Sequence, residues 1–141
     1  MKCFYKEELI GTAYIELSKG KYMNKMHNES IYFKENDFQV YEMIFSKFNP
    51  KYRPFSYTNF DSKTTNLIIL ELEKFVDIIS VNGNVVDALK DMNYDIYVLG
   101  NSSIDNIEST VINEVISTTY KLIEWLKNTM HNNNCFSVVG L

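Results

Sequence analysis

Residues 62–80 read SKTTNLIILELEKFVDIIS, a stretch rich in Leu and Ile. Its apolar residues recur every three to four positions, which is the spacing of a helix with one face toward a core. The inward stripe consists of Ile68, Leu72, Phe75, Val76 and Ile79. Further apolar residues in the first half widen this stripe beyond one face, as is typical of a helix at the centre of a domain. We therefore predict a core helix that begins between Asn59 and Ser62 and ends near Ser80.

Two further long helices are predicted, one before and one after the core helix in the chain. Before it, apolar residues at helical spacing predict a helix over 37–48, with Asn36 as its N-cap and a proline two residues beyond its end. After it, Asp105 and Glu108 resemble a capping box and predict a helix from there to Met130. The expected buried face of this last helix consists of Ile107, Val111, Val115, Leu122, Leu126 and Met130.

Strand patterns lie mainly near the two ends of the chain. Residues 9–18 are rich in β-formers and predict a strand, and residues 22–26 and 30–34 are candidates to pair with it. Residues 135–141 are a candidate terminal strand, and residues 94–100 are too short to assign but could form another.

These elements predict an α+β fold. We expect a single helix-dominated domain over 1–141, with a small antiparallel sheet built from the N-terminal segment and, as a candidate, the C-terminal tail. The sequence contains neither an internal repeat nor a linker-like segment, so one domain is the economical interpretation.

The segment after the core helix carries aspartates at four-residue spacing. The dipeptide at 82–83 is Asn-Gly, which suits either a hairpin turn or a helix end followed by a new helix capped by Asn84, and the spacing that follows favours the helix. Asp87, Asp91 and Asp95 would share one face if that helix continued so far. Such a face is either simply solvated or an acidic ridge that contacts Lys and Arg side chains of a partner.

An aromatic stretch, FNPKYRPFSYTNFD, runs from Phe48 into the core helix. Phe48 and Phe60 should be buried with the flanking helices. Tyr52, Phe55 and Tyr57 are also candidates for partner binding, although packing against the core helix is the favoured alternative because aromatic rings readily fill cores. Basic residues between these rings would suit stacking on single-stranded nucleic acid, which the acidic balance of the chain disfavours.

Catalytic, metal-binding and phosphate-binding motifs are absent from the sequence. His27 and His131 stand in no recognisable ligand pattern, and the nearness of His131 to Cys135 is a weak zinc signal. The glycines are isolated, so neither a Walker loop nor a dinucleotide fingerprint is present. Cys3 and Cys135 are expected to remain reduced thiols. We expect no cofactor.

The composition narrows the class of protein. The chain has 141 residues, 45% hydrophobic residues and a formal net charge of −4, which together favour a folded domain and disfavour nucleic acid or an anionic membrane as its main partner. The N-terminal residues lack the apolar core of a signal peptide, and no apolar run is long enough to span a bilayer. We predict a cytoplasmic protein whose partner is a basic protein.

The order of these segments resembles a known class of proteins. A short β-rich start and a helix are followed by YRPFSYTNFDSKTTNLIILELEKF, in which an aromatic segment leads into a long Leu-rich helix. In this respect the chain is similar to immunity proteins of bacterial polymorphic toxin systems, of the kind that accompany contact-dependent growth inhibition toxins. The resemblance implies stoichiometric binding of the C-terminal domain of one cognate toxin, commonly a basic nuclease. It implies neither enzymatic activity nor direct contact with nucleic acid or membrane.

Two interpretations from other classes stay open. One is a small enzyme with a scattered active site, for which Asp61, Tyr57 and His27 are the candidate residues. The other is a phage or bacterial adaptor protein that assembles through the aromatic stretch.

Overall fold

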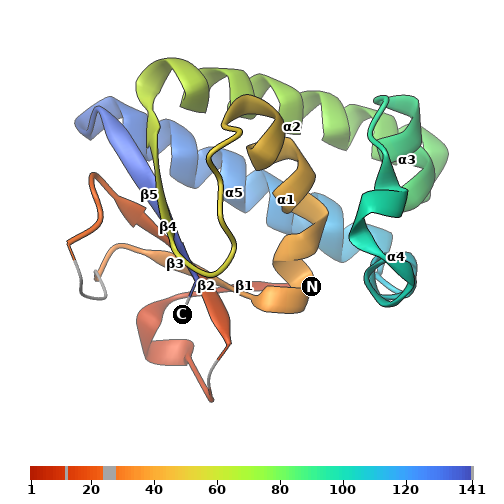
Figure 1. Ribbon diagram of the computed structural model, residues 1–141, viewed down its shortest axis with the longest axis horizontal. Helices are drawn as coiled ribbons and strands as arrows, with labels where there is room; N and C mark the ends of the chain where they lie inside the picture. Colours follow the sequence, from red (N-terminus) through yellow and green to blue (C-terminus); the bar gives the residue numbers. More distant parts are fainter. Residues whose placement is uncertain (12, 24–27, 141) are drawn as a thin grey trace.

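The protein has an α+β fold. A computed structural model describes residues 1–11, 13–23 and 28–140. A five-stranded antiparallel sheet lies beside three long helices, with a group of shorter helices at the opposite end of the molecule (Figure 1). The fold class predicted from the sequence is confirmed.

The elements follow one another in chain order, with η denoting a 3₁₀ helix. They are β1 (Cys3–Phe4), η1 (Lys6–Glu8), β2 (Tyr14–Lys19), β3 (Ile31–Lys34), α1 (Glu35–Phe48), β4 (Tyr57–Asp61), α2 (Ser62–Asn82), α3 (Val85–Asp91), η2 (Ile96–Leu99), α4 (Asn101–Glu108), α5 (Ile112–Asn132) and β5 (Cys135–Gly140).

The strand order in the sheet is β1-β3-β2-β5-β4, and all neighbours are antiparallel. The predicted terminal strand is therefore confirmed, and it lies between β2 and β4 rather than at an edge. Phe60 of β4 lies opposite Phe136 of β5, and their rings stack with centroids 4.8 Å apart. The end of the chain thus holds β4 in the sheet.

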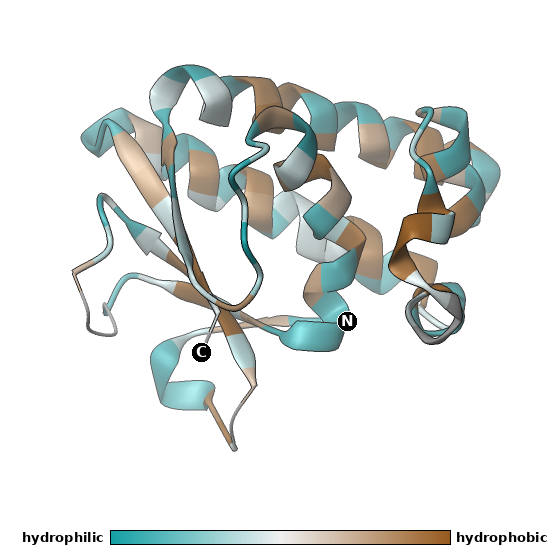
Figure 2. Ribbon diagram, in the orientation of Figure 1, coloured by the Kyte–Doolittle hydropathy of each residue, from teal (hydrophilic) through white to brown (hydrophobic). Residues whose placement is uncertain are grey.

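One face of the sheet packs against α1, α2 and α5. Alternate strand residues, such as Leu17, Phe33 and Val138, join the helix residues in one hydrophobic cluster. All five residues of the predicted α2 stripe are buried in it. In Figure 2 hydrophobic segments recur along the three long helices and the strands. No helix among the described residues is both long and apolar enough to cross a bilayer.

The N-terminal strand prediction is correct only in its second half. Of the predicted span 9–18, β2 takes up residues from Tyr14 onward. Gly11 and Ala13 both have positive φ angles, of 86° and 68°, so the chain turns there and cannot stay extended. The strand predicted over 30–34 corresponds to β3. For the candidate strand over 22–26, Tyr22 and Met23 are not in a strand, and the remainder lies outside the described residues.

A strand in front of the core helix was not predicted. Residues 57–61 form β4, and α2 begins only at Ser62 because the Asp61 side chain caps it by accepting a hydrogen bond from the Thr64 N–H at 2.7 Å. The start lies at the end of the predicted range. Helix α1 matches the prediction for 37–48, but it begins at Glu35 after Lys34, so Asn36 is inside its first turn and is not the N-cap.

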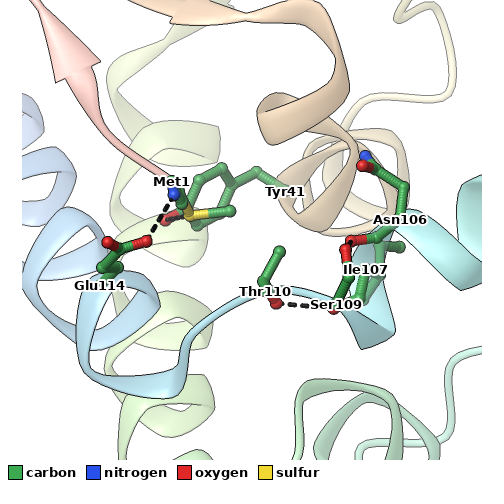
Figure 3. A network of polar contacts seen from close by, with 7 residues as sticks. All are labelled: Met1, Tyr41, Asn106, Ile107, Ser109, Thr110 and Glu114. Atoms are coloured by element: carbon green, nitrogen blue, oxygen red, sulfur yellow. Dashed lines mark hydrogen bonds and ion pairs between the residues drawn. The ribbon is translucent and has the colours of Figure 1, made fainter.

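The predicted final helix is in fact two helices. Asp105 lies within α4 and not at a helix start, and α5 begins at Ile112. The chain breaks between them because Ser109 and Thr110 turn their hydroxyl groups back onto carbonyl oxygens of the preceding turn, at 2.8 and 2.6 Å (Figure 3). Val111 was predicted to be buried, and this was wrong, since it lies exposed in this break.

The N-terminus is tied to α5 near the same break. The Met1 ammonium group pairs with Glu114 at 2.8 Å, and the Met1 sulfur lies 3.6 Å from the Tyr41 hydroxyl oxygen (Figure 3). The Tyr41 hydroxyl also lies 2.8 Å from that of Thr119, so α1 and α5 share a buried polar contact.

Candidate partner-binding site

The helix that was expected to carry three aspartates on one face is shorter than predicted. Helix α3 ends at Asp91, because Asn93 adopts a left-handed conformation with φ of 66°. Asp95 instead caps η2 by accepting a hydrogen bond from the Tyr97 N–H at 3.2 Å, so the expected continuous ridge does not form. Residues 94–100, which were only a candidate strand, contain η2 instead. The start of α3 was predicted correctly, since Gly83 ends α2 in the left-handed conformation and Asn84 caps α3.

Asp87, Asp91 and Asp95 are nevertheless exposed and belong to one part of the molecule. We call residues 85–108, which comprise α3, η2 and α4, the acidic lobe. It contains five carboxylates and a single lysine, Lys90, so its formal charge is −4. The whole chain also has a formal charge of −4, and the remaining residues are therefore balanced. All of the net charge is concentrated at one end of the molecule (Figure 1).

The acidic lobe also exposes apolar side chains. Tyr97 and Val98 of η2 are 73% and 76% exposed. The Lys90 ammonium group lies 5.8 Å from the centre of the Tyr97 ring. Figure 2 shows η2 as one of the most hydrophobic segments on this side of the molecule. A surface with negative charge around exposed apolar groups is suited to protein binding.

A groove separates the acidic lobe from α1. We call it the α1–η2 groove, and its volume is about 660 Å³. It is lined by Glu42, Met43, Ser46, Lys47, Lys74, Met92, Asn93, Tyr94, Asp95 and Val98. The groove therefore has apolar walls and a charged group at several points of its lining.

A polar network joins three elements at this groove. The Lys47 ammonium group donates to Glu71 Oε1 at 3.2 Å, and the Tyr94 hydroxyl donates to the same oxygen at 3.0 Å. The Lys47 nitrogen also lies 5.3 Å from the centre of the Tyr94 ring. Burial and the nearby Glu71 carboxylate raise the pKa of Tyr94 above its ordinary value, so its hydroxyl stays protonated as a donor. The network fixes the η2 end of the lobe to α1 and α2.

Glu42 connects the groove to the aromatic stretch. Burial, reinforced by Glu35, raises the pKa of the Glu42 carboxyl. The Tyr52 hydroxyl is close enough for Glu42 to raise its pKa as well, yet it has no hydrogen bond of good geometry within the described part of the chain. Glu42 thus lines the groove together with Asp95 and also lies near Tyr52 of the aromatic stretch.

The three central aromatic residues have different environments. Tyr52 is buried, as favoured, but burial of the other two was wrong: Phe55 is 83% exposed and Tyr57 is 53% exposed. The alternation of β4 turns Tyr57 away from the helices, where its ring lies 4.9 Å from that of Tyr22. At the two ends of the stretch, Phe60 is fully buried and Phe48 is half-buried.

The segment that carries Phe55 is held in place by its backbone. The Gly140 N–H donates to the Ser56 carbonyl at 2.9 Å, and the Arg53 N–H donates to Thr58 Oγ1 at 3.2 Å. The Asn49 side-chain amide donates to the Asn59 carbonyl at 3.2 Å, beside β4. Phe55 is therefore exposed on a tethered segment.

Within the described ranges, the candidate catalytic and metal-binding residues lie in different surroundings. Asp61 is occupied as the cap of α2, and hydrogen bonds from Thr64 lower its pKa. His27 lies outside the described residues. His131 is exposed at the end of α5, while Cys135 is half-buried in β5. Within the described ranges, no three His, Cys, Asp or Glu side chains are placed to hold a metal ion.

A buried polar cluster on the other face of the sheet was missed. Glu16, which is 1% exposed, accepts hydrogen bonds from the Ser30 hydroxyl at 2.7 Å and the Tyr32 hydroxyl at 3.2 Å. Burial and the nearby Glu16 carboxylate raise the pKa of Tyr32 to about 12. A glutamate inside an otherwise apolar strand pattern was the available signal.

Comparisons with other proteins leave the site to be interpreted from its own geometry. No protein-family model matches the sequence, and neither a curated protein nor a solved structure matches it.

Proposed function

We propose that this protein is an immunity protein of a bacterial polymorphic toxin system. It binds the C-terminal domain of one cognate toxin, a basic domain with nuclease activity, and neutralises it by stoichiometric inhibition in the cytoplasm. It uses no cofactor, catalyses no reaction and contacts neither nucleic acid nor membrane directly. The observation that carries the proposal is the concentration of the net charge of −4 in the acidic lobe.

A concentrated negative charge acts mainly on the rate of association. Opposite charge on a nucleic-acid-binding toxin domain would steer the two proteins together, and the effect weakens as salt screens it. Exposed Tyr97 and Val98 beside these carboxylates supply apolar area that can be buried once the complex forms. Charge and apolar surface thus have separate roles in the same interface.

Co-expression with the toxin domain encoded by the neighbouring upstream gene tests the proposal. The chain should rescue growth and co-purify with that domain at a one-to-one ratio. Failure of both rescue and complex formation would overturn the immunity function.

A charge-reversal pair tests the role of the lobe. Asp87→Lys with Asp91→Lys should slow association at low salt by at least about tenfold, as expected when electrostatic steering is removed. Asp77→Lys with Glu124→Lys is the matched control, because it makes the same change in net charge at exposed positions outside the lobe. Equal association rates for the two double variants would show that the lobe is not part of the interface.

Exposed Phe55 favours an adaptor protein as a second candidate function. A large aromatic side chain that is 83% exposed on a tethered segment is a typical anchor for a protein partner. An adaptor that assembles through this residue would lose its partner on Phe55→Ala and keep it on Asp87→Lys. An immunity protein that binds through the lobe would keep its partner on Phe55→Ala and associate with it more slowly on Asp87→Lys.

A further inference from the structure

The α1–η2 groove has charges that are compensated within the chain and charges that are not. Lys47 is paired with Glu71, so this cation is already neutralised. Glu42 and Asp95 take part in none of the ion pairs of the described residues. Lys74 is exposed and likewise forms no ion pair there. Two carboxylates against one ammonium group leave the groove with a net negative charge.

The Lys47 side chain shows how this groove holds a cation. Its ammonium group contacts the Glu71 carboxylate and lies near the Tyr94 ring, so one carboxylate and one aromatic face hold it together. Glu42 and Asp95 are carboxylates in the same groove, and Met43, Met92 and Val98 provide apolar walls. Long basic side chains place an aliphatic stem on apolar surface while the charged group reaches a carboxylate.

The position of Glu42 also indicates that the groove can bind a cation. Its carboxyl is partly buried between α1 and the aromatic stretch, where ionisation without a nearby cation is unfavourable, and its raised pKa reflects this. A cation placed beside it would remove that penalty. A basic side chain therefore gains more from Glu42 than from a fully solvated carboxylate on the lobe.

We propose that the α1–η2 groove is a receptor pocket for a single arginine or lysine side chain of the partner, with its charged group between Glu42 and Asp95 and its stem against Met43, Met92 and Val98. The identity of the macromolecule that supplies the side chain rests on the proposed function. The recognition of the side chain itself does not.

The two methionines of the groove allow a direct test. The chain has six methionines, and two of them, Met43 and Met92, line the groove. The full-length protein labelled with ¹³C at the methionine methyl groups is titrated at low salt with Nα-acetyl-arginine amide. Nα-acetyl-citrulline amide, which has nearly the same shape without the charge, is the matched probe. Nα-acetyl-glutamate amide is the probe of opposite charge.

The expected result is a saturable shift of the Met43 and Met92 signals with the arginine probe, and a much weaker one with the citrulline probe. Glu42→Gln and Asp95→Asn should each weaken binding about two- to fivefold, in line with one solvent-accessible ion pair. Asn retains the capping oxygen that η2 requires. Lys74→Gln should strengthen binding by a similar factor, because it removes a like charge. Glu124→Gln, at an exposed position of α5 outside both the lobe and the groove, is the control and should leave binding unchanged.

Several outcomes would overturn the proposal. They are equal shifts with the citrulline probe, stronger shifts with the glutamate probe, shifts confined to the other methionines, or no shift up to the solubility limit of the arginine probe. If the arginine probe binds but no toxin complex forms, the proposed immunity function is wrong and the proposed arginine pocket is supported. A toxin complex that is insensitive to Glu42→Gln, together with an absent probe response, would reject the pocket and keep the function.

Discussion

The backbone of Gly140 lies directly against the carbonyl group of Pro54, so that a Cβ at position 140 would collide with the Pro54 carbonyl oxygen. This contact joins the last residue of β5 to the segment that presents Phe55. The Gly140 N–H also donates to Ser56 in the same segment. The end of β5 therefore sets the position of an exposed aromatic residue that is more than 80 positions away in the sequence.

Gly140→Ala should consequently destabilise the protein by about 1–3 kcal/mol, the usual cost of forcing an extra group into packed backbone. The loss is measured as a lower midpoint of urea unfolding. Phe55→Ala is the control, since this exposed side chain should change the free energy of unfolding by less than about 0.5 kcal/mol. Equal effects of the two substitutions would show that the Gly140–Pro54 contact is not tight.

Tyr41→Phe should cost about 1 kcal/mol, because it removes a buried hydrogen bond between α1 and α5. Thr119 keeps its bond to the Val115 carbonyl at 2.7 Å, so its hydroxyl is not left alone. A double-mutant cycle with Thr119→Val measures the coupling, which should be at least about 0.5 kcal/mol for residues in contact. Strict additivity of the two changes would contradict the shared bond.

The raised pKa of the Tyr32 hydroxyl predicts that the folded protein loses stability at alkaline pH. Its pKa is raised from about 10 in the unfolded chain to about 12 in the folded protein. The folded state therefore keeps a proton that the unfolded state releases, so the contribution is complete below pH about 10 and is lost as the pH rises toward about 12. Unfolding free energies across this window, with tyrosinate absorbance as the readout, should fall less steeply for Tyr32→Phe than for the native chain. An unchanged slope would contradict the raised pKa.

Asn93 determines where α3 ends. Its φ of 66° suits glycine and is unfavourable for a β-branched residue. Asn93→Gly should therefore leave the free energy of unfolding nearly unchanged, whereas Asn93→Val should lower it by about 1–3 kcal/mol. Denaturant unfolding of the two variants gives the comparison, and a smaller cost for valine than for glycine would contradict the left-handed conformation. Asn93→Val should also change the backbone amide signals of Asp95 and Tyr97, because the turn sets the start of η2.

The sequence predicted those helices and strands that depend only on interactions between neighbouring residues. The stripe of α2, the capping of α3 by Asn84 and the extended tail depend on side-chain spacing and on short-range hydrogen bonds, so they could be recognised from the sequence. The charge of the acidic lobe could be counted as well. The expected ridge needed three aspartates on one helix, and a single left-handed residue, Asn93, prevented it.

The features that the sequence did not predict depend on strand pairing and packing between distant segments. Residues 57–61 become a strand because β5 lies beside them, and no local signal distinguishes them from a loop that leads into α2. For the same reason Tyr52 is buried while Phe55 and Tyr57 are exposed, although all three stand within one short aromatic stretch. Helices α1 and α2, the start of α3, the acidic charge and the candidate residues could be predicted from the sequence, because they follow from spacing and composition. That Glu42 and Asp95 line one groove could be seen only in the folded chain, because α1 and η2 meet through packing between segments about 50 residues apart.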